Sequence, residues 1–156
     1  MISRIGKSAA RLPRSGDRLT DWFFRQFVHF LRKETVCIKR KRRLVNPDDP
    51  HREAIRGLMD PEVHPSGRYV HILINPARDA NRTRDDEADT LIHELSHVVL
   101  GKTTERHVLQ LESILSARFT LLQRRIIKSF LPRHVVKRYP RISSRATLPR
   151  PRIMVL

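Results

Sequence analysis

The chain has 156 residues and a formal net charge of +16, with 32 lysines and arginines against 16 aspartates and glutamates. This length suits one domain with appendages and excludes the two-lobed body of a large protease. A single cysteine excludes an intramolecular disulfide and favours a reducing compartment. No stretch approaches the roughly 20 apolar residues of a membrane span, so we expect a cytoplasmic protein without a transmembrane segment.

Residues 1–16 form a basic segment that carries three serines and no acidic side chain. We interpret them as a flexible N-terminal arm, although the same composition is typical of an organellar transit peptide, which is the alternative localisation. Asp17 or Thr20 can then cap a helix that extends to Leu31. Its tryptophan and phenylalanines recur at helical spacing, so this aromatic face is expected to join the core; a membrane or cofactor surface is the alternative.

Two strands are predicted over residues 34–45 and 68–75, with a short helix over 51–59 between them. The first strand runs into the basic run 39–43, which suits either phosphate contact or a solvated sheet edge. The second alternates in a way that predicts a sheet packed on one face. We expect residues 68–75 to be the sheet edge beside the following helix, where an extended peptide could pair with its backbone.

Residues 93–97 read His-Glu-Leu-Ser-His within an apolar run of helical character, which is the His-Glu-x-x-His signature of zinc proteases. His93 and His97 lie four residues apart, on one face of a helix, so both imidazoles can reach one metal ion. Glu94 follows the first histidine, where its carboxylate can hold a metal-bound water. Acidic residues in 85–89 favour a helix start there, and Gly101 supplies the end.

A catalytic zinc ion takes a third protein ligand and leaves its fourth position for water. The candidates are Glu105, His107 and Glu112. Thr104 is the expected N-cap of a helix over 104–130, and the short turn before it makes the two helices neighbours. Glu105 is then best placed, His107 lies on another side, and Glu112 is two turns further on, either behind a ligand or itself the ligand.

The end of the chain is expected to contain little regular structure. Pro132 interrupts the long helix, and a second short helix is predicted over 133–139. Residues 140–156 are rich in proline and arginine without a period, so we interpret them as a C-terminal tail. The predicted domain therefore spans 17–139.

Residues 67–119 resemble the small zincin-like metallopeptidases of phage and bacterial genomes. The matching pieces are a strand at 69–75, the Thr-Leu-Ile-His-Glu-Leu-x-His helix at 89–97, and the pair Thr104-Glu105. The resemblance implies that His93, His97 and Glu105 are zinc ligands and that Glu94 is the general base. It also implies a minimal zincin-like α+β domain, in which a small, mostly antiparallel sheet packs on the motif helix and the following long helix.

The expected chemistry is zinc-dependent hydrolysis of peptide bonds in a protein or peptide substrate, with Glu94 activating the zinc-bound water. An additional donor should stabilise the developing oxyanion. Tyr69, His71, Arg106 and His107 are candidates for that role, and the sequence does not separate them. A partly exposed strand position is the alternative for His71.

The charge distribution supports a second hypothesis. Residues 61–100 carry a net negative charge, whereas both flanks are strongly positive, so the excess charge is not part of the motif region. Such a surplus favours a polyanionic partner such as nucleic acid. The alternative function is therefore a nucleic-acid- or ribosome-binding protein whose metal site is structural or vestigial. Both functions can be combined in one chain.

Overall fold

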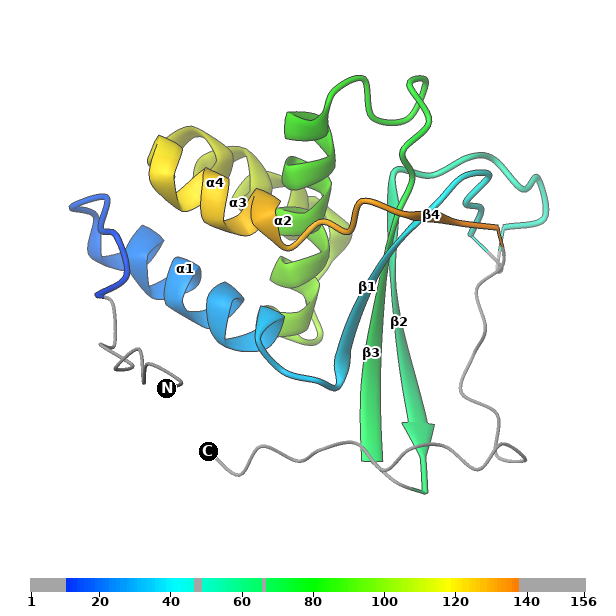
Figure 1. The fold of residues 1–156 in the computed structure, drawn as a ribbon, viewed down its shortest axis with the longest axis horizontal. Helices are drawn as coiled ribbons and strands as arrows, with labels where there is room; N and C mark the ends of the chain where they lie inside the picture. The colour runs from blue at the N-terminus through cyan, green and yellow to red at the C-terminus, as the bar shows by residue number, and fades with distance from the viewer. Residues whose placement is uncertain (1–10, 47–48, 66, 138–156) are drawn as a thin grey trace, which may run out of the picture.

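The computed structural model describes residues 11–46, 49–65 and 67–137, and within them it has an α+β fold (Figure 1). The elements follow in the order α1 (Arg18–Leu31), β1 (Val36–Lys41), β2 (Gly57–His64), β3 (Gly67–Ile74), α2 (Arg84–Leu100), α3 (Glu105–Arg118), α4 (Leu121–Ser129) and β4 (Val135–Val136). The helices form a layer on one side of the sheet. No helix in the described part of the chain is long and apolar enough to cross a membrane.

The sheet has the strand order β2-β3-β1-β4 and is mixed. β2 and β3 form an antiparallel hairpin, whereas β1 pairs in parallel with both β3 and β4. The expectation of a mostly antiparallel sheet was therefore wrong. Hydrophobic alternation identifies a strand but carries no information about its neighbour, and the long connection from β1 to β2 lets β3 return in the direction of β1.

β3 is a central strand, so the prediction that residues 68–75 form the sheet edge was also wrong. The edge on that side is β2. A short helix was predicted over 51–59, but residues 57–59 belong to β2 and 51–56 are not helical, so that prediction was wrong. Both faces of β3 are buried: Ile72 and Ile74 join the core under the helices, and Tyr69, His71 and Leu73 are buried on the opposite face. His71 is thus a buried residue that bonds Glu62 at 2.8 Å, not a partly exposed one.

Asp17, one of the two caps predicted for the first helix, and Gly101, the predicted end of the motif helix, are confirmed, whereas the cap at Thr83 was not predicted. Asp17 caps α1 by accepting from the backbone N–H of Thr20. Thr83 and Asp86 form a reciprocal capping box at the start of α2. Gly101 ends α2 with a φ of 65°, a left-handed conformation that favours glycine.

The predicted helix 104–130 is instead two helices. α3 ends at Arg118, the buried Phe119 turns into the core, and Thr120 starts α4 through a capping box with Gln123. Thr-x-x-Gln is a capping-box signature that interrupts an otherwise continuous apolar pattern. The helix predicted over 133–139 was wrong as far as the structure describes it, since Val135–Val136 form β4 beside β1.

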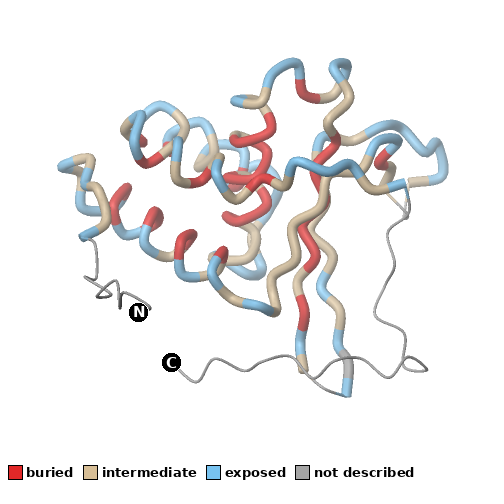
Figure 2. Tube along the Cα trace, in the orientation of Figure 1, coloured by how far each residue is buried: buried red, intermediate tan, exposed pale blue. Residues whose placement is uncertain are grey.

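The core lies between the sheet and the helices and along the inner face of α1 (Figure 2). Phe24 and Phe27 of α1 pack with their rings against Phe119, at centroid distances of 5.9 and 6.1 Å. Leu91 and Leu95 of α2 are fully buried beside them. Burial of each such side chain contributes roughly 1.5–3 kcal/mol to the stability of the fold. This cluster therefore holds α2 in place through its core-facing side.

Part of the predicted N-terminal arm contacts the helical layer. The carbonyl of Pro13 accepts from the side chain of Gln123, and Leu12 packs against the core. Residues 1–10 of the arm and the tail 140–156 lie outside the described residues.

Candidate metal centre

The two motif histidines lie on one face of α2, as their spacing predicts. The ring centroids of His93 and His97 are 5.0 Å apart. A connection of four residues then reverses the chain, and Thr104 caps α3 by accepting from the backbone of His107. Glu105 is the first residue of α3, so this short connection brings its carboxylate to the imidazoles.

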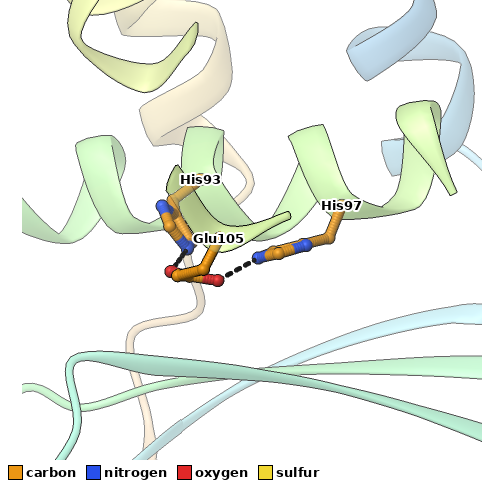
Figure 3. A group of neighbouring side chains, drawn as sticks. All are labelled: His93, His97 and Glu105. Carbon is orange, nitrogen blue, oxygen red and sulfur yellow. Dashed lines mark hydrogen bonds and ion pairs between the residues drawn. The ribbon is translucent and has the colours of Figure 1, made fainter. Parts of the chain in front are cut away.

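The three predicted ligands converge on one point (Figure 3). Glu105 reaches His93 Nε2 at 2.8 Å with one carboxylate oxygen and His97 Nε2 at 3.0 Å with the other. The candidate ligand atoms of these residues all lie within 4.8 Å of one another. Two imidazole nitrogens and one carboxylate oxygen form the donor set of catalytic zinc sites that leave the fourth position open.

Glu112 lies behind the first histidine. Its carboxylate is 2.9 Å from His93 Nδ1, and because an ionised carboxylate only accepts, Nδ1 carries the proton. The Nε2 of His93 is thereby directed towards the shared point as a candidate ligand atom. The other oxygen of Glu112 contacts Arg56 at 3.5 Å, so the carboxylate is itself oriented.

His93 faces a carboxylate at both ring nitrogens. Burial lowers the pKa of His93, but the hydrogen bond to Glu112 and the charges of Glu94, Glu105 and Glu112 raise it by more, so the net shift is upward. When His93 is protonated at both ring nitrogens, the Nε2 proton lies between His93 and Glu105, where a bound cation would lie. Metal binding at this site is therefore expected to release a proton.

Glu94 is the most buried acid of the group, with 6% of its surface exposed. Burial raises the pKa of its carboxyl to about 7; His93 and Arg56 lower it, while the charges of Glu105 and Glu112 raise it. A carboxyl with this pKa exchanges protons readily near neutral pH, as a general acid–base catalyst must.

The charges of the centre fit a divalent cation. Glu94, Glu105 and Glu112 supply three negative charges when ionised, and Arg56 supplies one positive charge beside them. With neutral imidazoles, a divalent ion would make the cluster neutral overall. Glu105 is 62% exposed, so the donor set faces solvent on one side while Glu94 is enclosed on the other.

A buried polar network holds α2 against the strands. The side-chain amide of Asn81 donates to the carbonyls of Asn75 and Arg56, and its oxygen accepts from the hydroxyl of Thr90, one turn before His93. These bonds connect the end of β3, the entry to β2 and the motif helix. They therefore fix the position of α2, and with it the candidate ligands, relative to β2 and β3.

Gly57 permits the closest approach between β2 and α2. A Cβ atom at this position would lie 2.5 Å from Thr90 Cγ2 and 2.8 Å from Glu94 Oε1. Any larger residue would therefore displace either the strand or the Glu94 side chain. The backbone of β2 passes directly beside the carboxylate because residue 57 has no side chain.

The structure excludes two of the four oxyanion candidates from the centre. Tyr69 and His71 are buried on the sheet face away from the helices, so they are excluded from the centre. Arg106 and His107 are exposed, and His107 Nδ1 contacts Thr104 Oγ1 instead of a ligand. This contact also leaves His107 out of the ligand group.

Sequence reasoning missed Arg56, the cation nearest to the three carboxylates among the residues named above. It was overlooked because residues 51–59 were interpreted as a helix remote from the motif. Arg56 directly precedes Gly57, the first residue of β2, and this strand approaches the motif helix closely. Had residues 57–59 been assigned to a strand, the position of Arg56 would have indicated that it lies near the motif.

Comparisons of the chain with protein-family models, with curated proteins and with solved structures found no match.

Proposed function

We propose that the chain is a zinc-dependent metallopeptidase of the small zincin-like kind. His93, His97 and Glu105 would hold the ion, and Glu94 would act as the general base. The observation that carries the proposal is the convergence of two imidazoles and one carboxylate within 4.8 Å, beside a buried carboxyl whose pKa is about 7. Local geometry thus supports both the ligand assignment and the assignment of the base.

The same three donors would also suit a mononuclear iron site, because two histidines and one carboxylate bind Fe(II) in oxygenases. Glu94 favours hydrolysis. An oxygenase has no need for a buried proton acceptor directly beside its ligands, whereas hydrolysis requires one to deprotonate water and return the proton.

When bound, zinc supplies Lewis-acid polarisation of the scissile carbonyl and lowers the pKa of water from 15.7 to about 7. Glu94 accepts the proton of the attacking water and later delivers it to the leaving amine. Glu112 holds His93 in the tautomer that binds the ion. Arg56, paired with Glu112, is the candidate donor to the developing oxyanion.

The edge strand β2 offers a place for an extended peptide. The Val70 N–H donates to the carbonyl of Thr35, the residue directly before β1, so the backbone of its partner Pro61 faces the opposite way, towards the edge that pairs with no strand among the described residues. By the same alternation Gly57 and Met59 present both N–H and C=O there. Pro61 lacks an N–H, so backbone pairing is expected to be strongest beside Gly57 and Met59, close to Glu94.

The test compares wild type with Glu94→Gln on an unstructured protein substrate, with and without a chelator. The variant is expected to retain one zinc per chain but to lose cleavage by at least about 100-fold. Glu53→Gln, an exposed position, is the matched control and keeps full activity. Undiminished cleavage by Glu94→Gln, or purified protein without stoichiometric metal, would remove the proposal.

Nucleic-acid binding by the basic flanks stays a separate prediction. A structural zinc site is closed by four protein ligands, and the group among the described residues has three with an exposed side at Glu105. This favours a catalytic site over a structural one. A salt-dependent gel shift that is unchanged by chelator and by Glu94→Gln would support the second activity.

A further inference from the structure

The first turn of α1 and the first turn of α4 lie together at the end of the helical layer away from the sheet (Figure 1). Arg118, at the end of α3, contacts the Asp17 carboxylate at 3.5 Å. Gln123 donates to the buried Asp21 at 2.9 Å. These two contacts tie 17–22 to 118–123 as one surface.

Four large apolar side chains are exposed on this surface. Leu19 and Trp22 are three residues apart on the outer face of α1 and are 61% and 41% exposed. Leu121 and Leu122 open α4 and are 77% and 54% exposed. Single exposed leucines are ordinary, but several gathered on adjoining helix starts mark an interaction surface.

The surroundings of these residues are positively charged. The exposed arginines on the same segments are Arg11, Arg14, Arg18, Arg25, Arg118 and Arg125. The acids of 11–33 are Asp17, which caps α1, and Asp21, which is buried; 113–137 contain none. Apolar side chains therefore protrude from a surface of net positive charge, in which Asp17 is a partly exposed acid paired with Arg118.

We propose that this surface, named here the α1–α4 end and defined by Leu19, Trp22, Leu121 and Leu122 with the flanking arginines, docks on an anionic lipid bilayer. The headgroup region of such a bilayer takes up leucine and tryptophan while its phosphates attract arginine. A nucleic acid matches the charge but offers no apolar layer for three exposed leucines. The docking is independent of the metal centre, none of whose residues belongs to this surface.

Trp22 is the only tryptophan of the chain, so its fluorescence reports directly on the proposed surface. Vesicles of phosphatidylcholine mixed with phosphatidylglycerol are titrated into the full-length protein, with pure phosphatidylcholine vesicles as the reference. We expect co-sedimentation and a blue shift of Trp22 emission with the anionic vesicles alone, both decreasing at high salt.

The double variant Leu121→Ser/Leu122→Ser is expected to bind the anionic vesicles about tenfold or more weakly, since both leucines lose their apolar insertion. Val63→Ser is the matched control, because Val63 is 80% exposed but lies on β2. Circular dichroism checks that both variants are folded. Vesicle binding without a blue shift, or equal binding by the double variant, would overturn the proposal in favour of charge attraction alone. Binding to duplex DNA but not to vesicles would overturn it in favour of a nucleic-acid surface.

Discussion

Replacement of Glu94 by glutamine is expected to stabilise the metal-free protein as the pH rises. Burial raises the pKa of the Glu94 carboxyl from 4.5 to about 7. The folded state therefore holds this proton more tightly than the unfolded state, and the resulting stability is complete below pH 4.5 and is lost as the pH rises through 7. At 1.36 kcal/mol per pH unit, the loss over this window is about 3 kcal/mol. Glutamine is neutral at every pH in this window, so the variant does not lose this stability.

The assay is urea unfolding of wild type and Glu94→Gln between pH 4 and pH 8 in the presence of a chelator. The free energy of unfolding of the variant should gain about 3 kcal/mol over that of wild type across this range. The exposed-site variant Glu53→Gln should show no comparable change. Saturating zinc should reduce the gain, because the cation stabilises the ionised carboxylate. A difference between Glu94→Gln and wild type that does not vary with pH would refute the reasoning.

Three further predictions concern the ligands and their supports. Glu112→Ala should raise the dissociation constant for zinc by about 10- to 100-fold in a competition with a chelating dye, because His93 loses the partner that orients it; unchanged affinity would exclude that role. Gly57→Ala should cost about 1–3 kcal/mol in the free energy of unfolding, because the new Cβ would meet Thr90 Cγ2 at 2.5 Å, and Thr90→Ser should recover part of it. Zinc at 100 times its dissociation constant should stabilise wild type by about 2.7 kcal/mol, measured by thermal unfolding, and an equal gain in His97→Ala would contradict the ligand assignment.

The convergence of the three candidate ligands was predictable because it depends on local geometry. The four-residue spacing of His93 and His97, the stop at Gly101 and the cap at Thr104 each act over a few residues, and together they place Glu105 against the imidazoles. The position of Glu112 behind a ligand follows from the same reasoning, since two helical turns return a side chain to nearly the same face.

The sheet was not predictable in the same way. Strand order depends on which elements meet across long separations, and the pattern of 68–75 is equally compatible with an edge or a central position. The stretch 51–59 was misinterpreted because its few apolar residues fit either period, and the close packing of Gly57 on Thr90, which requires an extended backbone there, is a tertiary contact. Arg56 was missed for the same reason.

The candidate metal ligands are all contained in residues 93–105, a span of little more than a dozen residues. Ring closure by a bound ion over so short a loop costs little chain entropy, and the contacts involved have a very low contact order. The helical hairpin formed by α2 and α3 could thus become a nucleus for folding that metal ions accelerate. Zinc should then increase the refolding rate. If formation of the sheet, which joins distant segments, limits the rate instead, refolding should be equally fast with and without zinc.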